Sequence, residues 1–288
     1  MEQTVYDSRR NALYRDRIKD FFIDCKIQAK SMADSHYHPY YEFFYVVKGS
    51  CRIFAEHNLF SVNAGELVII PPSTLHRSQY DGEHPVERIT LSFTADYINS
   101  FAQILNFNLL NELFVGKMSF FGKSRGDFLS ALQELLHESK NKDSFSEANT
   151  KALLTKIFIL VKRNSSNLKK NEIIGTENHT EQSIQKAAKY IFENYSDEIT
   201  LKTASRVAGM SDTYFSKKFM EITGFGFKEY LTNIRIKHSE EMLSFGKLTI
   251  TQIAGACGFT DANYFGDAFK KRNGCSPSNF RKKIATLN

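Results

Sequence analysis

Short apolar runs alternate with turn residues from residue 20 to about residue 95. The runs are FFIDCKI, YYEFFYVV, CRIFAEH, LFSV, ELVII and RITLSF, and turns such as Lys48-Gly49-Ser50 and Asp81-Gly82 separate them. Many short strands at near-regular spacing are typical of a β-sandwich or a β-barrel. The pattern therefore predicts a β-barrel over residues 18–95.

From about residue 96 the apolar positions follow a helical period. The polar stretch KNKDSFSE separates two groups with this period, which are Leu129, Leu132, Leu135 and Leu136, and then Leu153, Leu154, Ile157 and Val161. The spacing predicts two amphipathic helices that form a hairpin between residues 96 and 163. Such a hairpin either covers the barrel or pairs with a second subunit. Our working hypothesis is that it forms a homodimer.

The polar stretch at residues 164–180 lacks a sustained hydrophobic period, which is typical of a linker. Beyond it the pattern is helical to the end of the chain, with glycines between the helices. The chain is therefore divided into a first domain at residues 1–163, a linker at 164–180 and a second domain at 181–288.

The second domain contains an internal repeat. Residues 205–212, SRVAGMSD, match residues 254–261, AGACGFTD, at an offset of 49, and the aromatic pairs Tyr214-Phe215 and Tyr264-Phe265 match at an offset of 50 after one inserted residue. Each copy has a helical pattern, a glycine, an apolar residue, Ser/Thr-Asp and a second helical pattern. Two such copies predict tandem helix-turn-helix units rather than a solenoid, in which three or more repeats are usual.

Local physical chemistry supports this interpretation. Gly209 and Gly258 are placed to end the first helix of each unit in the left-handed conformation, and Ser211 and Thr260 are natural N-caps for the second, recognition helix. Phenylalanines at positions 215 and 219, and again at 265 and 269, predict the buried face of each recognition helix. The opposite face is then free to enter a major groove. Residues 227–244 are expected to form one long helix between the units.

Electrostatic charge is unevenly distributed between the domains. The chain has a net charge of +6, and residues 181–288 carry 16 basic and 11 acidic side chains, whereas the first 180 residues are close to neutral. An excess of positive charge in the helical domain favours a polyanion such as DNA. The hydrophobic content of 42% and the charged content of 24% are typical of a globular protein and exclude a wholly disordered chain.

The sequence also indicates the cellular compartment in which the protein is expected. No apolar run approaches the roughly 18 residues of a membrane-spanning helix, and the N-terminal sequence MEQTVYDSRRN lacks the apolar core of a signal peptide. Four cysteines form no CxxC pair, so reduced thiols are expected at Cys25, Cys51, Cys257 and Cys275. The protein is therefore expected to be cytoplasmic.

The repeat resembles the DNA-binding domain of a known protein family. Residues 253–281, IAGACGFTDANYFGDAFKKRNGCSPSNFR, are similar to the signature of the AraC/XylS family of bacterial transcription regulators. Residues 204–231 and the run NIRIKHSEEML resemble the rest of that domain, so the similarity covers about residues 181–285. The resemblance implies a double helix-turn-helix domain that binds promoter DNA and, as the common mode of the family, activates transcription together with RNA polymerase.

The resemblance also implies which side chains read bases. By position these are Thr213, Ser216 and Lys217 in the first unit, and Ala262, Asn263, Gly266 and Asp267 in the second. Lys217 is expected to donate to guanine and Asn263 to pair with adenine. A glycine offers no contact and a carboxylate repels phosphate. The second unit is therefore expected to recognise DNA shape more than sequence.

Further DNA contacts are expected beside these positions. Ser211 precedes the first recognition helix, and Arg235 matches an arginine of the family that either contacts DNA or holds the fold. Phosphate contacts, or alternatively solvated surface charges, are expected at Lys218, Lys270, Lys271, Arg272, Arg281 and Lys282.

A second pattern, in the first domain, resembles the two-part cupin signature HxHxxxE(x)6G and G(x)5PxGxxH. His36, His38 and Glu42 fill its first part and His76 ends its second, although Ser73 stands where the signature has glycine. This resemblance implies a cupin-like barrel. The expected fold class is α+β multidomain, with an N-terminal cupin-like β-barrel that carries a helical hairpin and a C-terminal all-α double helix-turn-helix domain.

Three histidines and one carboxylate suit a divalent metal ion, so His36, His38, Glu42 and His76 are candidate metal ligands. Sensor domains of the AraC/XylS family commonly keep this motif without a metal and use the pocket for a small effector. The same four residues, with Phe44, are then expected to line an effector site. Purely structural histidines are the third alternative, and Pro39 argues against a continuous strand through the motif.

The expected function is sequence-specific DNA binding under the control of a small effector. The family resemblance favours a carbohydrate effector, as do the aromatic side chains near residues 37–45. No catalytic residues are assigned, and the protein is not expected to be an enzyme. The alternative is a metal-dependent cupin enzyme, such as a dioxygenase or an isomerase, with an accessory DNA-binding domain.

Overall fold

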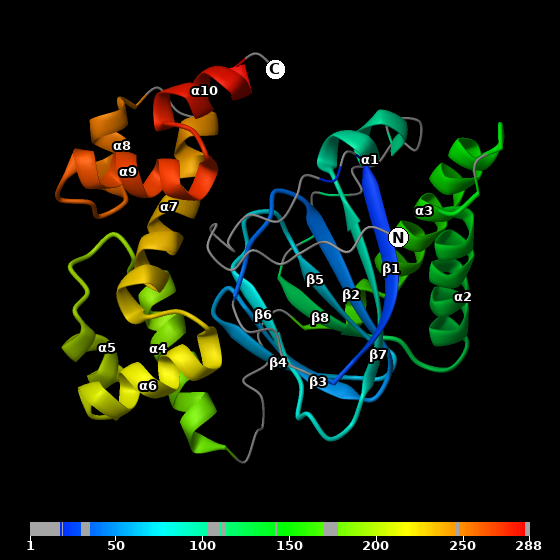
Figure 1. The fold of residues 1–288 in the computed structure, drawn as a ribbon, viewed down its shortest axis with the longest axis horizontal. Helices are drawn as coiled ribbons and strands as arrows, with labels where there is room; N and C mark the ends of the chain where they lie inside the picture. The colour runs from blue at the N-terminus through cyan, green and yellow to red at the C-terminus, as the bar shows by residue number, and fades with distance from the viewer. Residues whose placement is uncertain are drawn as a thin grey trace. The chain divides into compact units, whose positions relative to one another are not determined.

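The computed structural model describes residues 18, 20–29, 35–102, 110, 113, 115–141, 143–169, 178–245 and 248–285. These residues form two compact units, one within Arg15–Ile174 and the other within Gly175–Asn288 (Figure 1). The first unit is β-rich and carries a helical hairpin, and the second is all α, which is the expected α+β arrangement. The N-terminal stretch used above to exclude a signal peptide lies outside the described residues. None of the described helices has the length and apolarity that a membrane span requires.

Two antiparallel sheets form the N-terminal unit. The large sheet has the strand order β1-β7-β2-β5-β8-β9, and the small sheet has the order β4-β3-β6. In chain order the strands are β1 (Phe21–Gln28), β2 (Tyr41–Lys48), β3 (Ser50–Ala55), β4 (Asn58–Asn63), β5 (Glu66–Ile70), β6 (His76–Gln79), β7 (Val86–Phe93), β8 (Gly116–Ser119) and β9 (Leu168–Lys169).

The central strands of the large sheet are buried on both faces. On β2, Phe43 and Tyr45 belong to the core beneath the helices, whereas Phe44 and Val46 belong to the core between the two sheets. Because side chains alternate across a strand, a strand covered on both faces is apolar at successive positions. This explains why the runs YYEFFYVV and ELVII do not alternate with polar residues.

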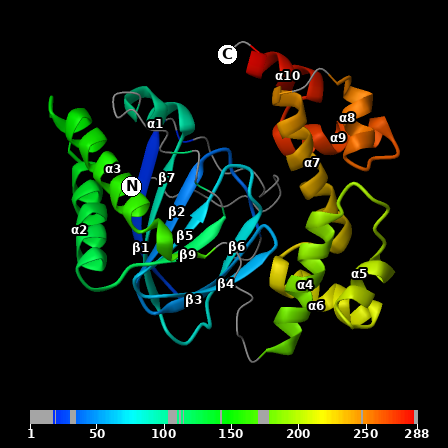
Figure 2. The ribbon, with the colours of Figure 1, turned by 180° about the vertical axis from the view of Figure 1, so that it is seen from behind.

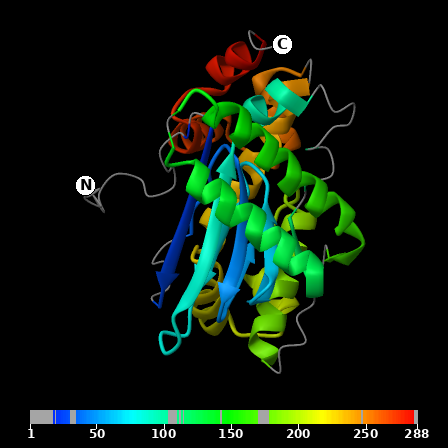
Figure 3. The ribbon, with the colours of Figure 1, turned by 90° about the vertical axis from the view of Figure 1, so that its right-hand side faces the viewer.

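The predicted hairpin consists of α2 (Gly122–Glu138) and α3 (Ser146–Arg163), and it covers the outer face of the large sheet (Figure 3). Phe158 of α3 contacts Phe93 of β7 with ring centroids 5.1 Å apart, and Phe128 of α2 lies 5.2 Å from Tyr45 of β2. Each fully buried aromatic side chain stabilises the fold by about 1.5–3 kcal/mol. The apolar face of the hairpin is therefore used within the chain. A homodimer through the hairpin stays a prediction.

Two elements differ from the expected pattern. The segment expected to be helical begins with α1 (Ala95–Ala102) but also contains the strand β8. The expected linker at 164–180 begins with a 3₁₀ turn at Ser165–Asn167 and with β9, which pairs with β8. A two-residue strand paired with residues about 50 positions earlier leaves no local hydrophobic pattern. Residues 170–177 of the expected linker lie outside the described part of the chain.

The C-terminal unit contains two helix-turn-helix pairs joined by a long helix (Figure 2). The long helix is α7 (Phe227–Phe245), about 28 Å at 1.5 Å per residue. The first pair is α5–α6 and the second is α8–α9. Besides α7, the described helices of this unit are α4 (His179–Glu193), α5 (Leu201–Val207), α6 (Asp212–Thr223), α8 (Ile250–Ala256), α9 (Ala262–Asn273) and α10 (Pro277–Ala285).

The turns of the two pairs follow the repeat with one correction. Gly209 and Gly258 have φ values of 68° and 80°, as predicted for left-handed helix ends. Ser211 caps α6 by accepting a hydrogen bond from the backbone of Tyr214. The prediction that Thr260 caps the second recognition helix is wrong, because Asp261 is the N-cap of α9. The inserted residue therefore lies in the turn, and α6 and α9 correspond throughout at an offset of 50.

Candidate functional site

Backbone pairing brings together the two parts of the histidine motif. His36 donates to the carbonyl of His76 at 3.0 Å, and His76 donates to that of His36 at 2.9 Å, which forms an isolated bridge. Pro39 lies between this bridge and the start of β2 at Tyr41. As Pro39 indicated, the motif is not one continuous strand. The bridge, rather than a shared strand face, collects the histidines.

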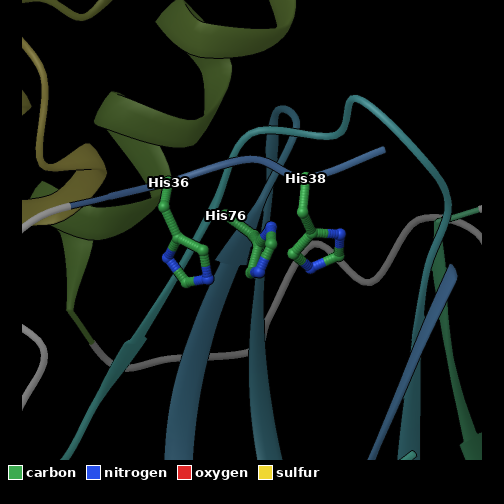
Figure 4. Close-up of side chains that lie close together, drawn as sticks. All are labelled: His36, His38 and His76. Carbon is green, nitrogen blue, oxygen red and sulfur yellow. The ribbon is translucent and has the colours of Figure 1, made fainter. Parts of the chain in front are cut away.

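The three histidines form one buried cluster (Figure 4). His36, His38 and His76 are 5%, 1% and 3% exposed, and one ring nitrogen from each lies within 4.8 Å of the others. His76 lies between the other two, with ring-centroid distances of 4.2 Å to His36 and 4.8 Å to His38. Among the described residues, no other group of His, Cys, Asp and Glu side chains gathers in this way.

Backbone carbonyls orient two of the rings. Nδ1 of His38 lies 2.9 Å from the carbonyl oxygen of Tyr40, and Nδ1 of His76 lies 2.8 Å from that of Thr74. A carbonyl oxygen only accepts hydrogen bonds, so each Nδ1 carries a proton and Nε2 of a neutral ring presents its lone pair. Metal-binding histidines are oriented in the same way in many proteins.

Glu42 joins the cluster through His38, with 3.3 Å between its Oε2 and Nε2 of His38. Burial would raise the pKa of Glu42, but the hydrogen bond from His38 and the positive charges of His38, His76 and His36 hold that pKa well below its usual range. Because Nδ1 of His38 already carries a proton, this contact is favourable only when a proton or a cation lies between Nε2 and Oε2. The three histidine nitrogens form a group that fits a divalent metal ion, and the Glu42 carboxylate lies beside this group through His38.

The distances between the histidine nitrogens can be compared with those in a metal site. A metal ion bound by two histidines at about 2.1 Å holds their nitrogens no more than about 4.2 Å apart. The histidine nitrogens lie within 4.8 Å of one another, so the most distant pair must approach by about 0.6 Å to reach this value.

A polar stripe on β7 extends from this cluster, and sequence reasoning missed it. The strand register pairs Ser92 with Glu42 and Thr90 with Phe44, so all four side chains share the face between the sheets. Arg88 follows on the same face, and its guanidinium carbon lies 5.1 Å from the ring centre of Phe44. The signal was present in RITLSF, where polar residues alternate with residues of the outer core.

Arg88 is held firmly in this buried position. Its Nε donates to Oε1 of Gln28 at 3.1 Å, its Nη1 donates to Oγ1 of Thr90, and Asp24 lies 3.5 Å away. Phe44, a predicted effector residue, therefore packs against a fixed arginine and belongs to the core between the sheets.

A cavity of about 520 Å³ lies elsewhere in the N-terminal unit. Its lining residues lie on the small sheet and just after β6, and they include Ser50, Arg52, Ser61, Asn63 and Gln79. None of the predicted effector residues lines it. The chemistry of the buried cluster, and not the size of a cavity, is therefore the basis for placing a site at the histidines.

The face of α6 expected to read bases is exposed. Phe215 and Phe219 are fully buried, and Thr213, Ser216 and Lys217 lie on the opposite side in contact with solvent. Ser211 is exposed and its hydroxyl caps the helix. Lys218 pairs with Glu221 at 2.8 Å, and this hydrogen bond raises the pKa of Lys218. Base contacts from this face stay predictions.

On α9 the same side is exposed, with Phe265 and Phe269 buried beneath it. The exposed residues on this helix include Ala262, Asn263, Asp267, Lys270 and Lys271. A cavity of about 520 Å³ lies beside them between α7 and α9, and Lys228, Tyr264, Asp267 and Lys271 are among its lining residues.

Three arginines predicted near DNA make bonds within the protein. Arg272 is 3% exposed and pairs with Glu240 at 3.1 Å, so its assignment as a phosphate contact is wrong. Arg235 donates to the carbonyl oxygens of Tyr195 and Asp197, both at 2.8 Å. Arg281 donates to the carbonyl oxygen of Leu248 at 2.7 Å. A DNA contact by Arg235 or Arg281 stays a prediction.

Both units match known protein families. Residues 25–158 match the family described as the AraC-like ligand binding domain, and residues 204–283 match a helix-turn-helix domain family.

Similar proteins cover different shares of the chain. The Msm operon regulatory protein of Streptococcus mutans is 22% identical over 244 residues, which are 85% of this chain and 84% of that protein. YijO of Escherichia coli, an uncharacterized HTH-type transcriptional regulator, is 35% identical over 94 residues, so the chain spans only 33% of the length of YijO. Among solved structures, apo ToxT from Vibrio cholerae covers 94% of this chain and 100% of its own length at 16% identity, with a TM-score of 0.41.

Proposed function

Because the chain belongs to the AraC/XylS family of transcription regulators, we propose that a small effector bound in its β-rich domain controls DNA binding by its helical domain. The observation that carries this proposal is the buried cluster of His36, His38 and His76 with Glu42. Burial of so many polar groups in an otherwise apolar core costs free energy, and such groups are typical of binding sites.

The effector is a polyhydroxylated small molecule, with a carbohydrate as the leading class. Imidazole nitrogens and the Glu42 carboxylate supply acceptors, and the hydroxyls of Thr90 and Ser92 on β7 both donate and accept. Tyr40, which stacks on His38 at 3.9 Å, supplies an aromatic surface beside these groups. This combination of convergent polar groups and an aromatic ring is typical of small-molecule sites.

A thermal-shift screen of the full chain against sugars tests the proposal. An effector at 100 times its dissociation constant stabilises the protein by about 2.7 kcal/mol and raises the melting temperature. The shift should be lost in His76→Ala and kept in His84→Ala, a matched control because the His84 side chain is 78% exposed and lies outside the cluster. An equal shift in melting temperature in both variants contradicts an effector site at the histidine cluster.

A metal-bound site is the second candidate, favoured by the 3.3 Å contact between His38 and Glu42. His36, His38, His76 and Glu42 would hold a divalent ion, which would act as a Lewis acid or bind effector oxygens. Elemental analysis of protein purified without a His-tag decides this question. A metal-to-protein ratio near one that falls in the His38→Ala variant supports the metal-bound site. A ratio near zero in the wild-type protein rules it out. Turnover by the metal-loaded chain would favour the rival cupin enzyme.

Assembly and transcription complete the proposal. The protein acts in the cytoplasm as a homodimer and activates promoters together with RNA polymerase. Light scattering measures the oligomeric state, and transcription in vitro with purified RNA polymerase measures the direction of regulation. A monomer at the concentration used for DNA binding contradicts the proposed homodimer. Repression by the effector-bound protein contradicts the proposed activation.

A further inference from the structure

The two recognition helices carry opposite charges at the same position. Helices α6 and α9 have the same length, and each ends at a glycine in the left-handed conformation. At the constant offset of 50, Lys217 of α6 corresponds to Asp267 of α9, and Met220 corresponds to Lys270. A lysine can only donate hydrogen bonds and an ionised aspartate can only accept them.

Asp267 lies where a recognition helix meets base edges. It is two residues after the buried Phe265, so it points about 200° away from that side chain at 100° per residue. It is exposed, like Asn263 one turn earlier. Lys217 has the same relation to the buried Phe215 in α6. The two side chains therefore occupy equivalent places on the two surfaces that face DNA.

In place of the shape recognition expected from the sequence, we propose that Asp267 makes the second unit select a base that presents an exocyclic amine in the major groove. Cytosine N4 and adenine N6 are the amines available there, whereas the O6 and N7 of guanine are acceptors that repel a carboxylate. Lys217 favours guanine at the equivalent position of the first half-site. The two half-sites read by one chain thus differ in sequence. The inference rests on the DNA binding proposed for the helical domain.

Neighbouring lysines offset the repulsion between Asp267 and the DNA phosphates. Lys270 and Lys271 follow Asp267 by three and four residues, which places them beside it on the helix surface. Lys228 and Glu229 of α7 line the same cavity between α7 and α9 as Asp267 and Lys271. Lysines therefore outnumber the other carboxylate around Asp267, which offsets its repulsion from the phosphates and lets it approach a base edge.

Selection of bound sequences from a randomised duplex library tests the proposal. The library is about 40 base pairs long, roughly four helical turns, and the full chain is used throughout. The wild-type protein should enrich cytosine or adenine at one position of the second half-site by at least about fivefold. Asp267→Ala should abolish the preference at that position alone, because alanine accepts no hydrogen bond from either amine.

The control is Glu221→Gln, which removes an exposed carboxylate from α6. Glu221 pairs with Lys218, and its loss should raise affinity for all duplexes without changing any base preference. An Asp267→Ala variant that raises affinity for all duplexes without changing any base preference overturns the proposal, because Asp267 would then act only by repelling DNA. Enrichment of no sequence by the wild-type protein overturns the proposed DNA-binding function as well, so the two failures are distinguishable.

Discussion

Gly258 packs against the backbone of Ser196 so closely that a Cβ atom at residue 258 would lie 2.6 Å from the carbonyl oxygen of Ser196. Ser196 lies between α4 and α5, and Gly258 lies in the turn before α9. Arg235 of α7 reinforces this contact by bonding to the carbonyls of Tyr195 and Asp197. The first helix-turn-helix bundle and the second are therefore joined by direct contact as well as by α7.

Substitution of this glycine tests the contact. Gly258→Ala should lower the free energy of unfolding by about 2–4 kcal/mol, because the left-handed conformation costs about 1 kcal/mol and the backbone clash adds about 1–3 kcal/mol. Gly209→Ala is the matched control, since Gly209 is also left-handed but has nothing within 4 Å of a Cβ. It should lose only about 1 kcal/mol. Equal losses in urea denaturation would show that the Ser196 contact is unimportant.

Adjacent basic residues on α9 should have separate effects. Arg272→Ala leaves the buried Glu240 carboxylate without its cationic partner, with the amide of Asn273 still bonded to it, and should destabilise the protein by about 3–5 kcal/mol. Lys271→Ala should change the free energy of unfolding by less than about 0.5 kcal/mol. It should reduce the slope of the logarithm of the DNA-binding constant against the logarithm of salt concentration by about one. Denaturation and binding at several salt concentrations measure the two effects. A stable Arg272→Ala protein with a reduced salt slope would restore Arg272 as a phosphate contact.

Lys217 should contribute to specificity more than to general affinity. Lys217→Ala should weaken binding to the selected duplex by about 1–3 kcal/mol, because the contact to guanine is lost, and should affect random duplex less. Competition binding with both duplexes measures the difference. Equal losses on both would assign Lys217 to the phosphates.

Thiol reactivity should report the burial of the two cores. Burial raises the pKa of Cys51 to about 12 and that of Cys257 to about 11, so almost no thiolate exists at pH 8. Burial and Glu87 also raise the pKa of Cys25, but Cys25 is exposed. Iodoacetamide at pH 8 should modify Cys25 in the native protein and should reach Cys51 and Cys257 only in denaturant, as followed by mass spectrometry. Rapid native modification of Cys51 would contradict the packing between the sheets.

Local signals predicted the helical domain well. The left-handed glycines and the phenylalanine spacing depend on residues within one or two turns of each other, so they are visible in sequence. The basic run Lys270-Lys271-Arg272 was misleading because the helix rotates by about 100° per residue. Arg272 follows Phe265 by seven residues and lies on the same buried face, a periodicity that could have identified it.

The N-terminal site was only partly predictable. The motif identified His36, His38, Glu42 and His76, but the bridge between His36 and His76 and the position of β7 depend on pairing between distant segments. The polar residues of β7 can be assigned to the site only once the register of β7 with β2 places them beside Glu42.

The short strand β9 extends the large sheet into the segment expected to be a linker. Glu42 lies on β2, which is hydrogen-bonded to β5, which is bonded to β8, which pairs with β9 at Lys169. Residues 168–169 therefore belong to the sheet that carries Glu42, so a free tether does not start at residue 164. A displacement of β2 on binding would be passed across three backbone ladders to Lys169, without any intervening loop.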